Sequence, residues 1–208
     1  AMTVAILIAV PIGILSATRQ YSLLDNGSML FALLGISMPN FWLGPLLILV
    51  FSIHLGWLPV SGMGGAQHLI LPAVTLGTAL AAILTRMTRA SVLEVIREQY
   101  IVTARAKGLG EPVVLFKHAL RNALTPVITI LGLQFGALLS GSIITETIFS
   151  WPGIGRLVIQ AVNQRDYPTI QGCVLFISLS YVLVNLATDL LYGVADPRIR
   201  IGEGSGDG

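Results

Sequence analysis

The longest uncharged stretch of the chain covers Asn26–Thr85 and reads NGSMLFALLGISMPNFWLGPLLILVFSIHLGWLPVSGMGGAQHLILPAVTLGTALAAILT, 60 residues without an Asp, Glu, Lys or Arg. A bilayer core roughly 30 Å thick is crossed by about 20 helical residues, so a run of this length has to cross and return. Within the run, His54–Gln67 holds four glycines and a proline, which end helices at this density. The stretch therefore predicts two membrane spans, over residues 28–54 and 68–88.

Three further runs, of 18, 24 and 22 residues, are also uncharged, and each is long enough for one span. Of the 208 residues, 54% are hydrophobic and 11% are charged, whereas soluble domains carry about 25% charged residues. The composition excludes a soluble domain and predicts an all-α, polytopic transmembrane helical bundle. Its five expected spans cover residues 2–17, 28–54, 68–88, 124–146 and 170–192.

Short loops rich in Lys and Arg stay in the cytoplasm, and this rule orients the bundle. With the first loop inside, ten of the twelve cations are cytoplasmic and only Arg156 and Arg165 are outside. The amino terminus is therefore expected outside and the carboxyl terminus in the cytoplasm, with residues 201–208 disordered. A net charge of +2 is too small to suggest nucleic-acid binding, which needs a clustered basic face.

Small residues at four-residue spacing predict close helix approaches in two spans. They are Gly132 and Gly136 in one span and Ala73, Gly77 and Ala81 in another. Prolines remove a backbone donor, so each one inside a span is expected to kink or start a helix. The prolines concerned are Pro39, Pro45 and Pro126.

Seven of the twelve cations lie between Arg86 and Arg121, in a segment too polar to span the membrane. The pattern predicts two short cytoplasmic helices, Ser91–Lys107 and Glu111–Asn122, separated by Gly-Leu-Gly, with Pro112 in the first turn of the second. Val113, Phe116 and Leu120 are expected on one apolar face of that helix. Such a face suits either anionic lipid headgroups or a docking protein, and both interpretations remain open from the residues alone.

Catalytic motifs are absent from the sequence. A phosphate-binding loop needs Gly-Lys followed by Ser or Thr, but the two lysines, Lys107 and Lys117, precede Gly and His. No histidine starts an HExxH metal motif, and no GxSxG nucleophile motif occurs. We therefore expect no catalytic residue, no metal site, no cofactor bound by this chain and no enzyme activity of its own.

Five stretches together resemble the permeases of ATP-binding-cassette (ABC) importers, in the dipeptide, oligopeptide and nickel branch. The resemblance extends from about Val10 to Arg200 and implies one permease domain of the type I importer class over residues 1–200. The stretches are Gly35–Gly44 (GISMPNFWLG), Tyr100–Gly108 (YIVTARAKG), His118–Pro126 (HALRNALTP), Glu146–Gly155 (ETIFSWPGIG) and Asp196–Arg200 (DPRIR).

The resemblance implies that the cytoplasmic segment 91–122 is the EAA loop, which docks on an ATP-binding subunit. The acidic residue of the general EAA pattern is replaced by Val102, while Ala104, Gly108 and Leu120 match it. The docking residues implied are Tyr100, Thr103, Ala104, Arg105, Ala106, Lys107, Gly108, Leu109, Phe116, His118 and Leu120.

The same resemblance implies the partners: a second homologous permease subunit, two ATP-binding subunits that use ATP and Mg, an extracytoplasmic substrate-binding protein and the lipid bilayer of the cell inner membrane. It also implies six spans where five are visible. The chain is therefore expected to be the core translocation domain of a larger permease, or a permease without its first segment. Peptide, glutathione and nickel-chelate permeases share these motifs, so the substrate stays open.

Polar side chains inside spans are candidates for the substrate pathway, because polar residues at membrane depth usually face the interior. Gln134, Asn185 and Asp189 are the candidates. Interhelical hydrogen bonds explain Gln134 and Asn185 equally well, and an interfacial salt bridge suits Asp189.

On the outer side, Trp151, Arg156 and Arg165 are candidates for contact with the substrate-binding protein. Trp151 alternatively anchors the chain at the membrane interface. Two other classes of function stay open. The first is an ion-coupled secondary transporter, although such proteins usually need ionisable residues near the membrane midplane and these spans have none. The second is a membrane scaffold that docks a partner without transport.

Overall fold

The computed structural model describes the backbone of residues 1–195 and their side chains except 137, 139–141, 189 and 191–195. The predicted tail 201–208 and the motif Asp196–Arg200 lie outside this part. All regular structure within residues 1–195 is helical. The helices are α1 (Met2–Thr18), α2 (Leu23–Ser37), α3 (Asn40–Leu47), α4 (Gln67–Ile96), α5 (Gln99–Ala106), α6 (Glu111–Val113), α7 (Leu120–Ile148), α8 (Ile154–Gln164) and α9 (Tyr167–Ala195), with the wider π-helical segments η1 (Ile48–His54) and η2 (Val114–Ala119).

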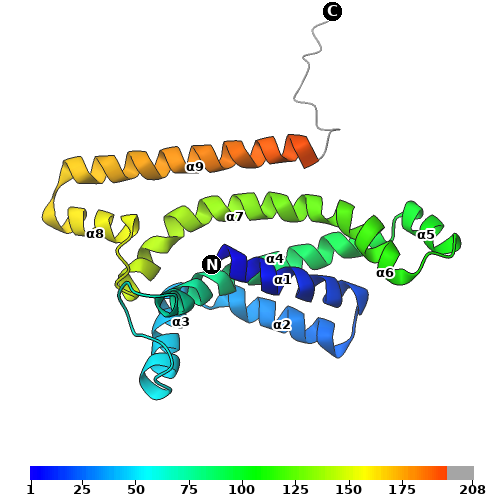
Figure 1. The fold of residues 1–208 in the computed structure, drawn as a ribbon, viewed down its shortest axis with the longest axis horizontal. Helices are drawn as coiled ribbons and strands as arrows, with labels where there is room; N and C mark the ends of the chain where they lie inside the picture. Colours follow the sequence, from blue (N-terminus) through cyan, green and yellow to red (C-terminus); the bar gives the residue numbers. More distant parts are fainter. Residues whose placement is uncertain (196–208) are drawn as a thin grey trace, which may run out of the picture.

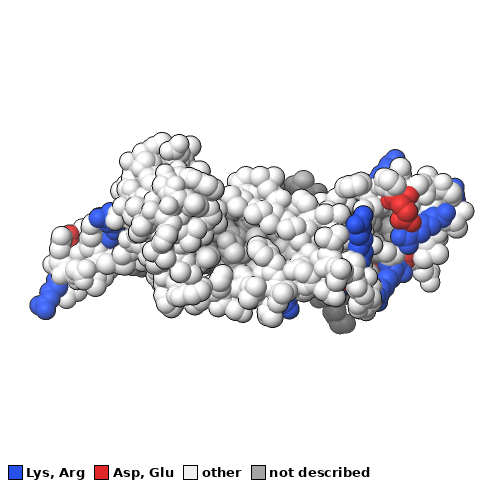
Figure 2. Space-filling model, turned by 90° about the horizontal axis from the view of Figure 1, so that it is seen from below, with Lys and Arg blue, Asp and Glu red and all other residues white. Residues whose placement is uncertain are grey.

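The long helices lie side by side along one axis, with α5 and α6 at one end of the molecule and α8 at the other (Figure 1). The core lies where α1, α4 and α7 meet, and small residues on α1 allow the close approach. Its buried residues are Ala5, Ala9, Leu80, Ala81, Leu84 and Val127. Charged side chains gather mainly at the α5 end and more sparsely at the α8 end, while the middle of the face in Figure 2 is almost uncharged. This distribution fits a bundle that crosses a membrane along its long axis.

Two helices of the described part, Gln67–Ile96 and Tyr167–Thr188, are long and apolar enough to cross a membrane by themselves. A third span results if the bent pair Leu23–Ser37 and Asn40–His54 counts as one. The predicted span 28–54 is therefore not one straight helix, because the pair is bent by 104°. The residue before a proline avoids the helical region, and Met38, which precedes Pro39, has an extended ψ of 114°.

The predicted close approaches are confirmed where side chains are described. A Cβ added at Gly77 would lie 3.1 Å from the carbonyl oxygen of Ala1, the residue just before α1. On α7, Gly132 packs against Thr188 of α9 and Gly136 against Tyr181 of α9. A Cβ at either glycine would lie within 3.0 Å of these α9 side chains, so the side chain or the helix would have to shift.

The boundaries of the cytoplasmic helices differ from the prediction. A single helix over Ser91–Lys107 was expected, but α4 continues to Ile96 and the chain breaks at Arg97 and Glu98 before α5. The expected Glu111–Asn122 helix is not separate either, because α6, η2 and α7 follow each other without a gap. The long helices α4 and α7 thus extend directly into the polar end.

The predicted apolar face of the second cytoplasmic helix is not the face that packs on the rest of the chain. Val113 and Phe116 are exposed, while Val114 and Ala119 are buried. The five-residue spacing of the buried pair fits the π-helical turn of η2, in which residues i and i+5 share a face. A pattern read at 3.6 residues per turn does not show this buried pair, because it assumes an α-helix.

Candidate functional site

The polar end of the molecule is built by α5 packing on η2. Ile101 and Ala104 of α5 are buried against Val114 and Ala119 of η2. Ala104, expected at the docking surface, is thus part of this small core. Removal of four apolar side chains from water holds the two elements together although both are short.

The turn between α5 and α6 is closed by an ion pair. Arg105 donates to both carboxylate oxygens of Glu111, with N–O distances of 2.7 and 3.2 Å. The side chains are 40% and 69% exposed, so the pair fixes geometry more than it adds stability. Gly108 has a φ of +78°, a conformation that L side chains rarely adopt. The predicted glycine break is therefore confirmed, and its backbone conformation favours glycine.

Most of the predicted docking residues lie at the surface of this polar end. Asn122 of α7 donates a hydrogen bond of 2.7 Å to the hydroxyl of Tyr100 of α5, a second tie between the two elements. His118 and Leu120 are half-buried on the helical run that begins with α6. The exposed residues are Tyr100, Thr103, Arg105, Ala106, Lys107, Gly108, Leu109 and Phe116.

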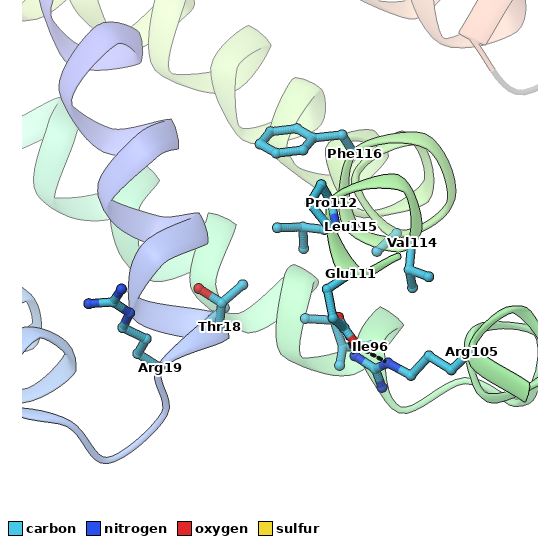
Figure 3. Close-up of a pocket in the computed structure, with 11 residues that line it drawn as sticks. Thr18, Arg19, Ile96, Arg105, Glu111, Pro112, Val114, Leu115 and Phe116 are labelled. Carbon is cyan, nitrogen blue, oxygen red and sulfur yellow. Dashed lines mark hydrogen bonds and ion pairs between the residues drawn. The ribbon is translucent and has the colours of Figure 1, made fainter. Parts of the chain in front are cut away.

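A cleft of about 560 Å³ separates this unit from the end of α1. Figure 3 shows Pro112, Leu115 and Phe116 on one side of it and Thr18 and Arg19 of the α1 end across from them. The Arg105–Glu111 ion pair lies at its edge. The sequence did not predict that the end of α1 lines this cleft, because no motif links Thr18 with Phe116.

A buried ion pair lies near the same end of the bundle and was also missed. Arg89 of α4 donates to Asp25 of α2 through Nε and Nη2, at 2.6 and 2.8 Å. The hydroxyl of Ser16 on α1 donates to the same carboxylate, which also accepts from the backbone N–H of Tyr21 at 2.9 Å. One carboxylate thus joins α1, α2 and α4. The one sequence feature that could have indicated this ion pair is the position of Asp25, a lone acidic residue directly before the 60-residue uncharged run.

The pathway candidates fall in different environments. Gln134 is 7% exposed on α7, and its amide nitrogen and oxygen have no hydrogen-bond partner among the described residues. The alternative of an interhelical hydrogen bond for Gln134 is therefore not seen in this conformation. Asn185 is half-buried on α9, and the side chain of Asp189 lies outside the described part.

The three outer candidates lie at and beside α8. Arg156 is half-buried and donates to the carbonyl oxygen of Ser150 at 2.9 Å, while Arg165 ends α8 in the left-handed conformation and is exposed. Trp151 is half-buried. Asp166 follows and caps α9, and hydrogen bonds from the Thr169 hydroxyl and backbone N–H lower the pKa of its carboxyl.

Metal ligands do not cluster in the described part of the chain. No group of three or more His, Cys, Asp or Glu residues there could hold a metal ion. The single cysteine, Cys173, is buried on α9. The described part thus offers exposed side chains at the α5 end and buried polar groups between helices.

Comparisons with known proteins agree with this geometry. The family model described as "Binding-protein-dependent transport system inner membrane component" matches residues 9–201. The di/tripeptide transport system permease protein DppB of Pseudomonas aeruginosa (strain UCBPP-PA14) is 48% identical over 90% of this chain and 64% of its own length. The glutathione transport system permease protein GsiC of Escherichia coli (strain K12) is 51% identical over 96% of this chain and 65% of its own length.

The chain thus spans slightly less than two thirds of the length of these relatives. A crystal structure of an amino acid ABC transporter with histidines shares the fold, with a TM-score of 0.63 over 95% of this chain and 88% of that chain, at 18% identity. The resemblance drawn from the sequence motifs is confirmed, and with it the type I importer permease fold. This chain belongs to the family of binding-protein-dependent transport system inner membrane components.

Proposed function

We propose that the chain forms the translocation core of a permease subunit in an ABC importer that moves peptides into the cell. The relatives at 48% and 51% identity are named for di- or tripeptides and for glutathione, which is itself a tripeptide. Short peptides are therefore the substrate class that the comparisons support best, ahead of the nickel chelates left open by the motifs.

One structural observation carries the proposal. α6, η2 and α7 form an uninterrupted helical run from Glu111 to Ile148, which joins the exposed polar end to the opposite end of the bundle. α4 likewise continues through its apolar part to Ile96. Force applied to the polar end therefore reaches the apolar bundle through continuous helix rather than through a loop.

In this proposal, ATP-binding subunits contact α5 and η2 from the cytoplasm. Tyr100, Thr103 and Phe116 expose their side chains there, and the Arg105–Glu111 pair keeps the turn in one geometry. ATP and Mg are used by those subunits, and closure between them tilts α4 and α7 together. A second permease subunit completes the pore.

The α8 end faces the outside in this orientation and receives the substrate-binding protein. The amino terminus of the chain lies on the same side and the carboxyl terminus is cytoplasmic. The direction of α1, α4 and α9, which all run from the α8 end toward the α5 end, supports this arrangement (Figure 1). On the face shown in Figure 2, the charged side chains gather mainly at the α5 end, which agrees with the positive-inside rule.

The proposal is tested by uptake into vesicles that contain the full-length permease with its ATP-binding and binding-protein partners. We expect uptake of dialanine or glutathione that requires internal ATP and survives dissipation of the proton gradient. Uptake driven by the proton gradient without ATP would support the ion-coupled alternative. ATPase subunits that bind in the absence of any uptake would support the scaffold.

A matched pair of variants tests the docking surface. Phe116→Ala removes an exposed ring of η2 and is expected to weaken copurification of the ATP-binding subunit. Leu133→Ala, which removes an exposed side chain of α7 within the apolar region, is the control and is expected to leave copurification unchanged. Equal copurification of both variants and the unchanged protein would contradict docking at η2.

A further inference from the structure

Glu146, in the last turn of α7, lies beside the first turn of α8. Its Oε2 accepts a hydrogen bond of 3.0 Å from the backbone N–H of Arg156, the third residue of α8. Its Oε1 accepts one of 3.0 Å from the hydroxyl of Ser142, one turn earlier on α7. The carboxylate therefore bridges the two helices. It also places a negative charge at the positive end of the α8 dipole, where an anion is favoured.

Two glycines make this arrangement possible. A Cβ added at Gly153, the residue that caps α8, would lie 2.3 Å from the carboxylate of Glu146. A Cβ added at Gly155 would lie 2.9 Å from Oε2 and 2.7 Å from the Cα of Ile143. Cβ atoms essentially never lie within 3.0 Å of a non-bonded heavy atom. An alanine at Gly155 would therefore force the backbone of α7 to shift, whereas an alanine at Gly153 would displace the Glu146 carboxylate.

The link between the helices is otherwise short and strained. Ser150 has a φ of +50°, a left-handed conformation in a non-glycine residue. The backbone N–H of Trp151 donates to the carbonyl oxygen of Glu146 at 2.8 Å, and Arg156 donates to the carbonyl of Ser150. Residues 146–156 thus form a compact corner in which the Glu146 carboxylate accepts a hydrogen bond directly from the backbone of α8, beside the packing of Ile143 on Gly155 and the bond from Arg156 to Ser150.

We propose that Glu146 is the positioning residue that fixes α8 to the end of α7, so that α8 moves as one body with the helical run from Glu111 to Ile148. The proposal rests on the transport function proposed above. It adds that movement at the cytoplasmic surface is delivered to the outer helix α8 and so to the surface expected to meet the substrate-binding protein.

The fixation is tested with a spin label on α8 of the full-length permease, assembled with its partners in lipid nanodiscs. Cys173→Ala removes the single cysteine of these 208 residues, any cysteine elsewhere in the permease or its partners is replaced as well, and Asn163→Cys places the label on an exposed position of α8. Glu146→Ala is expected to increase label mobility, and Glu146→Gln, which keeps an oxygen acceptor, to restore most of the immobilisation. Ser142→Ala is the matched control, because it removes one hydrogen bond of the carboxylate without touching α8. Unchanged mobility in Glu146→Ala would overturn the proposal.

A double substitution provides a second, independent measurement. Gly153→Ala alone is expected to mobilise the label, since the new Cβ displaces the carboxylate. In the Glu146→Ala background the same change should add little, because the group it displaces is gone. If Gly153→Ala increased label mobility by the same amount with and without Glu146→Ala, the proposed contact would be overturned.

Transport is measured on the same variants as ATP-dependent uptake of dialanine. The proposal expects Glu146→Ala to lose at least tenfold in uptake while the basal ATPase rate stays within twofold, with Ser142→Ala unaffected. Full uptake despite a mobile α8 would overturn the link between α8 and transport. Absence of ATP-dependent uptake in the unsubstituted protein, with the mobility results as expected, would refute the proposed function and leave the positioning role of Glu146 standing.

Discussion

The ion pair between Arg89 and Asp25 allows a quantitative test of how the bundle is held together. The two side chains are 20% and 2% exposed, and the carboxylate also accepts hydrogen bonds from Ser16 and Tyr21. Arg89→Met keeps the length of the side chain and leaves Asp25 as an uncompensated buried charge. Removal of one partner of such a pair costs about 3–5 kcal/mol.

The reverse variant, Asp25→Asn, is expected to cost less than Arg89→Met in spite of the unpaired guanidinium. An amide oxygen at this position still accepts from the Tyr21 N–H, and Arg89, being a fifth exposed, can reach water. The double variant Asp25→Asn with Arg89→Met leaves no buried charge, so it is expected to be more stable than Arg89→Met alone. Replacement of both members of a buried pair is often close to neutral.

The assay is equilibrium unfolding in mixed detergent micelles, followed by circular dichroism on the unsubstituted protein, both single variants and the double variant. Thr18→Ala, an exposed position at the end of α1, is the control and is expected within about 0.5 kcal/mol of the unsubstituted protein. A loss in Arg89→Met of less than about 1 kcal/mol, or additivity of the two single variants, would refute the buried-charge reasoning.

Three further predictions follow from the described geometry. Gly108→Ser should lower the free energy of unfolding by about 1–2 kcal/mol, because a φ of +78° is unfavourable for an L residue, and should weaken binding of the ATPase subunit about tenfold. Gly110→Ser is the control: its φ is −64°, so this variant should bind the ATPase subunit within twofold of the unsubstituted protein. Gln134→Leu should raise unfolding stability by about 1–3 kcal/mol, since a buried amide without partners is costly, while uptake falls; lower stability would show that the amide has a partner. Thr169 lowers the pKa of Asp166, so this carboxylate stabilises the fold fully above its ordinary pKa of about 3.9, and the stabilisation is lost as pH falls through the lowered pKa. The thermal midpoint of the unsubstituted protein should therefore fall more steeply below about pH 4 than that of Asp166→Asn.

Several features of the fold could be predicted because they depend on neighbouring residues. A run of apolar residues is helical in a bilayer whatever it later packs against, since every backbone group must be bonded within the segment. The helices α4, α7 and α9 therefore lie where the uncharged runs predicted them. Gly108 as a helix break and Pro112 in the first turn of α6 are local in the same sense.

Helix boundaries and helix type were less predictable, because they also depend on how the helices pack against each other. Pro39 was recognised as a site of a kink or a start, yet the size of the bend, 104°, depends on how α3 packs against α4 and α7. At η2 the π-helical turn rotates Val114 and Ala119 inward and Phe116 outward. A pattern read at 3.6 residues per turn cannot show such a change.

The amino-acid sequence by itself determined the class of the protein, its apolar helices, the position of its charged end and the motifs that identified its family. The tertiary structure alone decided which groups meet: Asp25 with Arg89 across 64 positions, Glu146 with the start of α8, and the end of α1 with η2 across a cleft. The physical reason is that hydrophobicity and backbone preference are properties of short segments. A hydrogen bond or ion pair requires two groups within about 3 Å, and only the packing of whole helices sets that distance.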